Sequence, residues 1–112
     1  MDGSGVCLVL ITAPADERAG ALARSLVEER LAACVNLIPQ IRSVYRWEGQ
    51  VQEDGETLLL VKTTAAALPA LERRVGELHP YELPEFLVLP ELAGSAAYLG
   101  WVRDSVGGEG GS

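Results

Sequence analysis

The stretch VNLIPQIRSVYRWEGQVQEDGETLLLVKTT, residues 35–64, decides the fold of this chain. Through residues 35–47 the side chains alternate with a period of two, which is typical of a strand, and residues 51–64 continue with strong β-formers. Glu48-Gly49-Gln50 separates the two halves and indicates a turn. The stretch therefore predicts a long β-hairpin, with these residues sharing one side of its first strand: Val35, Leu37, Ile41, Tyr45 and Trp47.

Two residues interrupt the hairpin. Pro39 has no backbone N–H to donate, so it predicts a sheet edge or a bulge in the first strand. Gly55 lies inside the second strand and suggests a second bulge or bend there.

The segments on either side of the hairpin predict three helices and two further strands. Residues 6–11 form a continuous apolar run, which predicts a central strand buried on both faces, and the segment from Thr12 to Asp16 ends it and starts a helix. A second helix is expected at residues 66–78, with Pro69 in its first turn, and a short strand at residues 85–89. Ser95 is expected to cap a last helix. The order β-α-β-β-α-β plus a terminal helix predicts an α+β, ferredoxin-like sandwich of four antiparallel strands.

Length and charge limit the classes of protein that fit. The 112 residues predict a single domain, residues 1–106, followed by a flexible Gly-rich tail, residues 107–112. A net charge of −7 repels phosphate backbones, so no nucleic-acid partner is expected. No apolar run approaches the roughly 20 residues of a membrane helix, and the first residues lack the pattern of a signal peptide. We therefore expect a cytoplasmic protein without a membrane partner.

The hairpin is too long for a chain that stays alone. Strands of about 13 residues reach roughly 43 Å, whereas helices of about 15 residues cover only roughly 22 Å of sheet. The overhanging tip carries Tyr45 and Trp47, which are costly to leave in water. The length mismatch predicts a closed ring of identical copies. The alternative is that Pro39 and Gly55 break the hairpin and a loop covers its tip.

Several segments together resemble one family, the CutA divalent-ion tolerance proteins, over about residues 6–106. They are LAACVN at residues 31–36, SVYRWEG at 43–49, LVKTT at 60–64, HPYELPE at 79–85 and YLGW at 98–101. The resemblance implies a P-II-like homotrimer in which the long hairpins pair between subunits. It also implies a role in tolerance of copper and other divalent metals, and some members bind copper.

The metal ligands of copper-binding members are only partly present. Such members place a cysteine just before Thr-Ala-Pro and a His-His pair before Pro-Tyr, where this chain has Ile11 and Leu78-His79. Cys34 and His79 remain as candidate ligands for copper or another divalent cation, which would not be required for folding. The alternatives are that Cys34 fills space between a helix and a strand, and that His79 caps the carbonyls at the end of its helix.

A second candidate site is a cleft between subunits. Lys62 lies in an otherwise apolar strand, where it either faces solvent or pairs with Glu85 under the cover of another copy. Aromatic walls with a few polar groups are typical of small-ligand sites. From the family resemblance, the expected cleft residues are Tyr45, Trp47, Lys62, His79, Tyr81 and Glu85.

No enzyme class is indicated. The chain lacks a G-x-S-x-G elbow, a P-loop and a C-x-x-C motif, and His79 has no evident nucleophile as a partner. The predicted function is a homotrimeric protein of divalent-ion tolerance that binds copper or similar cations. The alternatives are a P-II-like regulatory trimer that binds a metabolite or partner protein at its clefts, and an assembly that scaffolds another protein.

Overall fold

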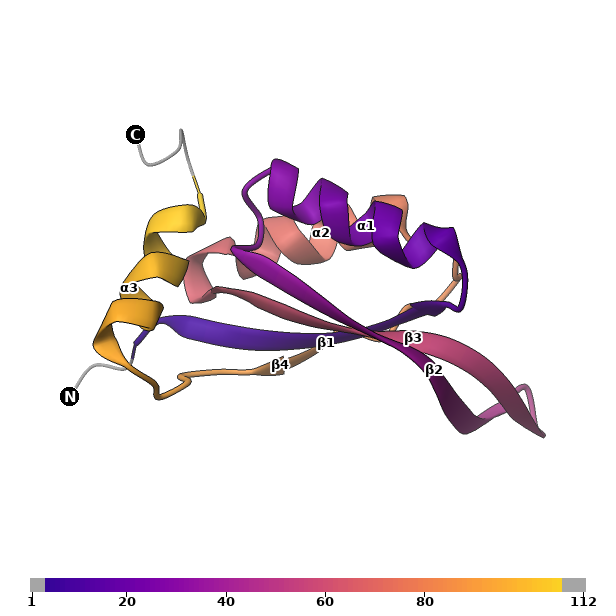
Figure 1. The fold of residues 1–112 in the computed structure, drawn as a ribbon. Helices are drawn as coiled ribbons and strands as arrows, with labels where there is room; N and C mark the ends of the chain where they lie inside the picture. The colour runs from indigo at the N-terminus through magenta and orange to yellow at the C-terminus, as the bar shows by residue number, and fades with distance from the viewer. Residues whose placement is uncertain (1–3, 108–112) are drawn as a thin grey trace.

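A computed structural model describes residues 4–107 as a four-stranded antiparallel sheet with two helices on one face (Figure 1). The strand order is β2-β3-β1-β4, which confirms the predicted ferredoxin-like α+β fold. The elements are β1 (Val6–Pro14), α1 (Glu17–Glu28), β2 (Cys34–Trp47), β3 (Gln50–Thr64), the 3-10 turn η1 (Ala65–Ala67), α2 (Leu68–Leu78), β4 (Leu87–Leu89) and α3 (Ala96–Ser105).

Two sequence predictions fall at the chain ends. The expectation about the first residues rests largely on residues 1–3, and the predicted tail lies mostly at residues 108–112; both ranges are outside the described residues. Within residues 4–107, no helix is long and apolar enough to cross a membrane.

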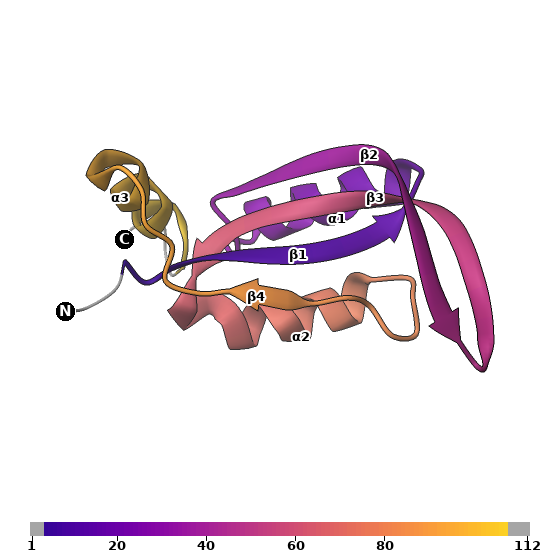
Figure 2. The same ribbon diagram turned by 90° about the horizontal axis from the view of Figure 1, so that it is seen from below.

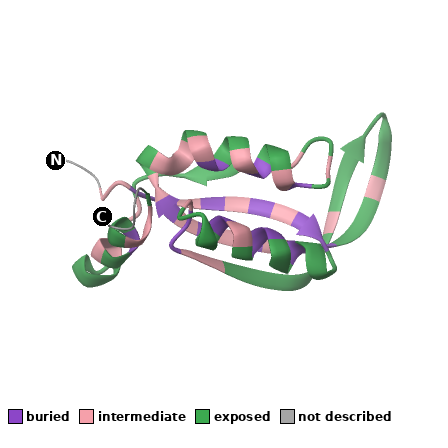
Figure 3. Ribbon diagram, turned by 90° about the horizontal axis from the view of Figure 1, so that it is seen from above, coloured by how far each residue is buried: buried purple, intermediate pink, exposed green. Residues whose placement is uncertain are grey.

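The core lies between the sheet and the helices α1 and α2. Its members are apolar residues from the two inner strands and the inward faces of both helices, among them Val9, Ile11, Leu59, Val61, Leu22, Leu26, Leu71 and Val75. Within one chain, β1 is fully buried on one face only, and Leu8 and Leu10 on the other face are half-buried. Figure 3 shows this alternation of buried and intermediate residues along the strand. The helices α1 and α2 lie on one side of the sheet (Figures 1 and 2). Among residues 4–107, the other side is covered only at the start of β1, where Val102 of α3 packs with Val6.

The helix starts follow the predicted caps. Asp16 accepts the backbone N–H of Arg18 at the start of α1, and Ser95 accepts that of Tyr98 at the start of α3. Pro69 lies in the first turn of α2, where no hydrogen bond is lost. β1 runs on through Pro14 instead of ending near Ile11, because these added residues stay paired with β3.

The hairpin extends beyond the rest of the sheet. Glu48 and Gly49 both have positive φ, which makes the tight two-residue turn that suits twisted strands. The pairing of β1 with β3 ends at Pro14 opposite Glu56, so residues 42–55 pair only with one another. We call residues 42–55 the arm. Figure 2 shows the arm bending away past the end of β1, and the molecule is 45 Å along its longest axis.

A bulge in β2 decides which way the arm's side chains point. Ile38 lies opposite Leu58 and Ile41 opposite Glu56, so Pro39 and Gln40 together face one residue of β3. The bulge predicted at Pro39 is confirmed. Gly55 stays in unbroken register opposite Arg42, so no second bulge exists, although the arm bends near this end of the sheet.

The bulge also corrects the predicted sides of β2. Val35 lies opposite Val61, and Ile41 lies opposite Glu56. Residues 56 and 61 are an odd number of positions apart, so they face opposite sides of the sheet. The prediction that Val35 and Leu37 share a side with Ile41, Tyr45 and Trp47 is therefore wrong, because one extra residue inverts the alternation. This inversion places Tyr45 and Trp47 on the side of Glu56.

Candidate functional site

A cleft of about 1170 Å³ lies where the arm, the start of α1 and the loop between α2 and β4 meet. Its charged and aromatic lining residues are Arg18, Tyr45, Arg46, Trp47, Asp54, Glu56, Tyr81, Glu82 and Glu85. Four of them, Tyr45, Trp47, Tyr81 and Glu85, belong to the predicted set.

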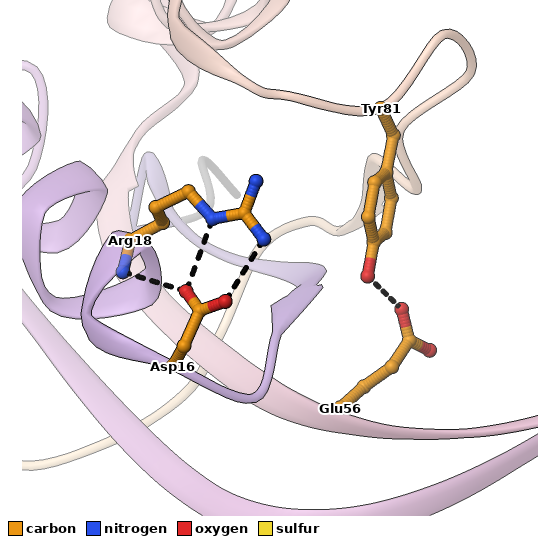
Figure 4. A network of polar contacts seen from close by, with 4 residues as sticks. All are labelled: Asp16, Arg18, Glu56 and Tyr81. Carbon is orange, nitrogen blue, oxygen red and sulfur yellow. Dashed lines mark hydrogen bonds and ion pairs between the residues drawn. The ribbon is translucent and has the colours of Figure 1, made fainter.

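The Tyr81 and Glu56 pair joins the loop to the sheet. The Tyr81 hydroxyl donates to Oε2 of Glu56 at 2.8 Å, and Glu56 is the first residue of β3 that pairs with β1 (Figure 4). Glu56 is only 7% exposed. Burial, and after it the bond to Glu56, raises the pKa of Tyr81, so the phenol stays protonated and remains a donor.

A second tyrosine and carboxylate pair lies two residues further out on β3. The Tyr45 hydroxyl donates to Oδ2 of Asp54, and both side chains are exposed. This bond, and after it burial, raises the pKa of the Tyr45 phenol. The two pairs give the cleft one protected and one solvated carboxylate.

His79 does not line the cleft, but its ring connects the loop between α2 and β4 to β1. Its Nδ1 accepts the backbone N–H of Tyr81 at 3.1 Å, so Nε2 carries the proton and donates to the Thr12 carbonyl at 2.8 Å. The ring is 7% exposed, and its centroid lies 4.7 Å from that of Tyr81. The alternative that the imidazole caps the end of α2 is wrong, because the ring reaches β1 instead.

Arg18 stands at the rim of the cleft with its charge already paired. Its Nε and Nη2 donate to the two carboxylate oxygens of Asp16 at 3.1 and 2.8 Å (Figure 4). These bonds hold the pKa of Asp16 below its usual value. Arg18 therefore contributes little free positive charge to the cleft.

Lys62 lies away from the cleft within the chain. Its Nζ donates to Oδ1 of Asn36 and lies 4.0 Å from Sγ of Cys34. Lys62 is opposite Leu8 on β1, and Thr12 at the cleft is four residues further along, or about 13 Å. No ion pair joins Lys62 to Glu85 among the described residues. The pairing suggested for them is not formed in one chain.

The two candidate metal ligands are also apart. Cys34 is half-buried beside Lys62, whereas His79 is bound to Thr12, and both nitrogens of that imidazole are already engaged. Across residues 4–107, no group of three or more His, Cys, Asp or Glu side chains is placed to hold a metal ion. One chain therefore gathers no ligand set around either residue.

Sequence reasoning missed Arg18, Asp54 and Glu56. Glu56 shares one side of β3 with Leu58 and Leu60, but Asp54 and Lys62 lie on that side too, so the sequence pattern does not single it out. Its burial and its bond to Tyr81 identify it only in the structure.

Comparison with known proteins decides the family. The family model described as CutA1 divalent ion tolerance protein matches residues 7–105. This chain belongs to the CutA1 family. The match covers every strand and helix that forms the cleft.

Comparison with individual relatives supports the same family assignment. The chain is 55% identical over 100 residues to the divalent-cation tolerance protein CutA of Thermus thermophilus, which covers 89% of this chain and 97% of the relative. A solved structure of the divalent cation tolerance protein (Cut A1) from Thermus thermophilus superposes with a TM-score of 0.88 at 54% identity, covering 91% of this chain and 99% of that one. These names support a role for the family in divalent ion tolerance.

A plant relative is longer than this chain, and its name places it in the chloroplast. Protein CutA, chloroplastic, of Arabidopsis thaliana is 47% identical over 98 residues, covering 88% of this chain and 54% of the relative. The chain thus spans about half the length of that CutA protein, and the family is not confined to one cellular compartment.

Proposed function

We propose that this protein acts in divalent-ion tolerance as a homotrimer whose subunits cover one another's sheets. The observation that carries the proposal is the apolar side of the sheet that lies opposite α1 and α2. Leu87 on β4 is 56% exposed and Leu89 is 43% exposed. The half-buried leucines beside them on β1 and β3 are Leu8, Leu10, Leu58 and Leu60.

The arm adds a second uncovered surface. Its exposed apolar side chains lie on both sides of the arm: Val44 and Val51 are 66% and 65% exposed on one side, and Trp47 is 38% exposed on the other. Monomeric proteins rarely leave contiguous apolar patches of more than a few hundred Å² in water. Because burial stabilises by roughly 25 cal/mol per Å², covering both surfaces with identical copies would contribute many kcal/mol.

Light scattering coupled to gel filtration tests the assembly. The expected mass is three times the 11.9 kDa of one chain. A folded particle with the mass of one chain in dilute buffer would overturn the trimer.

A matched pair of variants locates the interface. Leu87→Glu places a charge on the uncovered side of the sheet, so the mass is expected to fall toward that of one chain. Val27→Glu places the same charge on α1, at a side chain that is 41% exposed, and is expected to keep the assembled mass. If Leu87→Glu stays assembled, the interface lies elsewhere.

The metal part of the proposal assigns copper or another divalent cation to His79 and Cys34. Copper binding at His79 would require the imidazole to release Thr12 or Tyr81, and ligands from other copies would have to complete the site. Titration with Cu²⁺ should show tight uptake that His79→Ala and Cys34→Ala each weaken. Equal, weak uptake by all three proteins would remove both residues from the proposal.

The cleft favours a second candidate function, a non-enzymatic cytoplasmic regulator that binds a small ligand. Its support is the meeting of Tyr45, Trp47 and Tyr81 with polar groups in a space large enough for a metabolite. Ligand-dependent increases in melting temperature would support this function. A broad screen of metabolites without any increase would count against it.

A further inference from the structure

The cleft carries an excess of negative charge. Four carboxylates line it, those of Asp54, Glu56, Glu82 and Glu85, against the two guanidinium groups of Arg18 and Arg46. Arg18 is held by Asp16, and Nη1 of Arg46 points to the Gly49 carbonyl at 3.5 Å. The Gly49 carbonyl is neutral, so Arg46 keeps its positive charge. Since Arg18 is paired with Asp16, the four carboxylates of the lining face one unpaired guanidinium group.

Glu56 supplies the most protected of these carboxylates, with one oxygen left open. The side chain is more than nine-tenths buried, and Tyr81 bonds only Oε2 (Figure 4). Within residues 4–107, Oε1 has no hydrogen-bond partner, and no fully buried side-chain oxygen or nitrogen is unpaired. Oε1 is therefore accessible, and because Glu56 lines the cleft it is available to a ligand there.

Glu85 brings a second carboxylate into the same space. It is half-buried and comes from the loop that carries Tyr81. Burial, and after it the charge of Glu56, raises the pKa of Glu85. Two carboxylates that disfavour each other's charge are stabilised by a cation placed between them.

The walls of the cleft suit an organic cation better than a metal ion. Tyr45, Trp47 and Tyr81 present aromatic rings, which attract cations through their faces. A metal ion needs several ligand atoms within about 2.6 Å of one point, and the described residues gather no such group. A cleft of about 1170 Å³ with separated carboxylates instead matches a cation of several carbon atoms.

We propose that this cleft binds an organic ammonium compound, held by Glu56 and Glu85 and packed against Tyr81 and the aromatic residues of the arm. The proposal rests on the second candidate function above, that the cleft holds a small ligand, and names the chemical class of that ligand. Tyr81 orients Glu56 and is a positioning residue as well as a wall.

Calorimetric titration of the full chain with putrescine, a diammonium compound, tests the proposal. Butanediol, its neutral analogue, and succinate, a dianion of similar length, are the matched probes. Putrescine should bind, and the other two should bind at least tenfold more weakly, because butanediol brings no positive charge to the carboxylates and succinate is repelled by them. Comparable binding of butanediol or succinate would overturn the assigned class.

Variants place the binding in the cleft. Glu85→Gln and Glu56→Gln should each weaken putrescine binding about tenfold or more. Glu72→Gln removes the same charge from an exposed position of α2 and should leave the affinity unchanged. Since Glu56 is buried, Glu85→Gln decides the matter if the Glu56 variant does not fold. Unchanged affinity in Glu85→Gln would overturn the proposal.

Fluorescence provides an independent readout. The chain has two tryptophans, so Trp101→Phe leaves Trp47 at the cleft as the only tryptophan reporter. Putrescine should change the Trp47 emission, and Mn²⁺ at the same concentration should not. No response to putrescine, or an equal response to Mn²⁺, contradicts an organic-cation site.

The assembly is measured in the same samples, so that the failures can be separated. A single-chain mass with putrescine binding refutes the trimer and keeps the ammonium site. An assembled particle that excludes putrescine would show that another copy fills the cleft, which overturns this inference and leaves the trimer standing. Binding of succinate instead would keep a small-ligand function and replace the ligand class.

Discussion

β3 passes through two environments along its length. From Glu56 to Thr64 it lies between β1 and β2 with α1 and α2 above it, and Glu56 and every second side chain from Thr57 onward are buried. From Gln50 to Gly55 it belongs to the arm, pairs only with β2, and has exposed side chains apart from Gln52. The ladder with β2 continues through both halves. Pairing alone therefore does not bury a strand, and what differs is the cover supplied by other elements.

The same boundary separates the two tyrosine and carboxylate pairs. Tyr81 donates to Glu56 at a position where β3 is still paired with β1. Tyr45 donates to Asp54, two residues away in the arm, where that pairing has ended. Chemically the two pairs are alike. Since hydrogen bonds gain strength as water is excluded, they are expected to differ in energy. Variants on the two sides of Glu56 therefore measure how abruptly the burial of β3 changes along its length.

The largest effect is expected in the covered half of β3. Leu59→Ala removes a fully buried side chain from the core and should lower the free energy of unfolding by about 3 kcal/mol, from lost burial and a residual cavity. Urea denaturation followed by circular dichroism measures the change. Val51→Ala in the arm is the matched control and should cost well under half as much. Equal losses would mean that the arm is packed as tightly as the core.

The next effect is expected in the arm. Trp47→Ala should weaken assembly by about 2 kcal/mol per subunit, because large aromatic side chains dominate protein interfaces. Trp47 lies in the arm, outside the part of the sheet that α1 and α2 cover, so the circular dichroism of each chain should be unchanged. Sedimentation over a dilution series measures the association, with Val27→Ala as the control on α1. A Trp47 variant that associates like the wild type would show that the arm is not part of the interface.

A smaller effect separates the two tyrosine pairs. Tyr81→Phe leaves a buried carboxylate without its donor and should cost about 1 kcal/mol of stability. Tyr45→Phe removes the equivalent bond at an exposed carboxylate that water can solvate, so no measurable change is expected. Denaturant midpoints of the two variants test the comparison. A larger loss for Tyr45→Phe would place a covered environment at the arm instead.

The fold was predictable because its signals are local. The turn at Glu48-Gly49, the bulge at Pro39 and the caps at Asp16 and Ser95 each follow from residue types that suit one backbone conformation. The side of the sheet that each side chain faces was harder to predict. A single extra residue in β2 inverts the alternation, and the inversion is visible only once the register with β3 is known.

The candidate site was predictable only in part. The aromatic residues of the arm and the loop carrying Tyr81 and Glu85 line one cleft within the chain, whereas the predicted cleft between subunits stays a prediction. Lys62 was assigned to the same place, yet it lies about four residues along the sheet from the cleft. His79 lies behind the loop because of a bond to a β1 carbonyl that no sequence pattern announces. Contacts between distant segments, not residue types, decide these positions.

The smallest effect concerns the pH dependence of Glu85. Burial, and after it the charge of Glu56, raises its pKa above the ordinary 4.5, so the folded chain holds that proton more tightly than the unfolded chain. The stabilisation is therefore present at acidic pH and is lost as the pH rises through the folded pKa. Glu85→Gln should gain a few tenths of a kcal/mol at neutral pH. Urea midpoints should show this gain shrinking toward about pH 4, below the ordinary pKa. The exposed Glu72→Gln should show no such trend. Lower stability of the Glu85 variant at neutral pH would contradict this prediction. It would mean that a positive group already stabilises the ionised carboxylate. The cleft would then resemble the covered part of β3, from Glu56 to Thr64, more than the exposed arm.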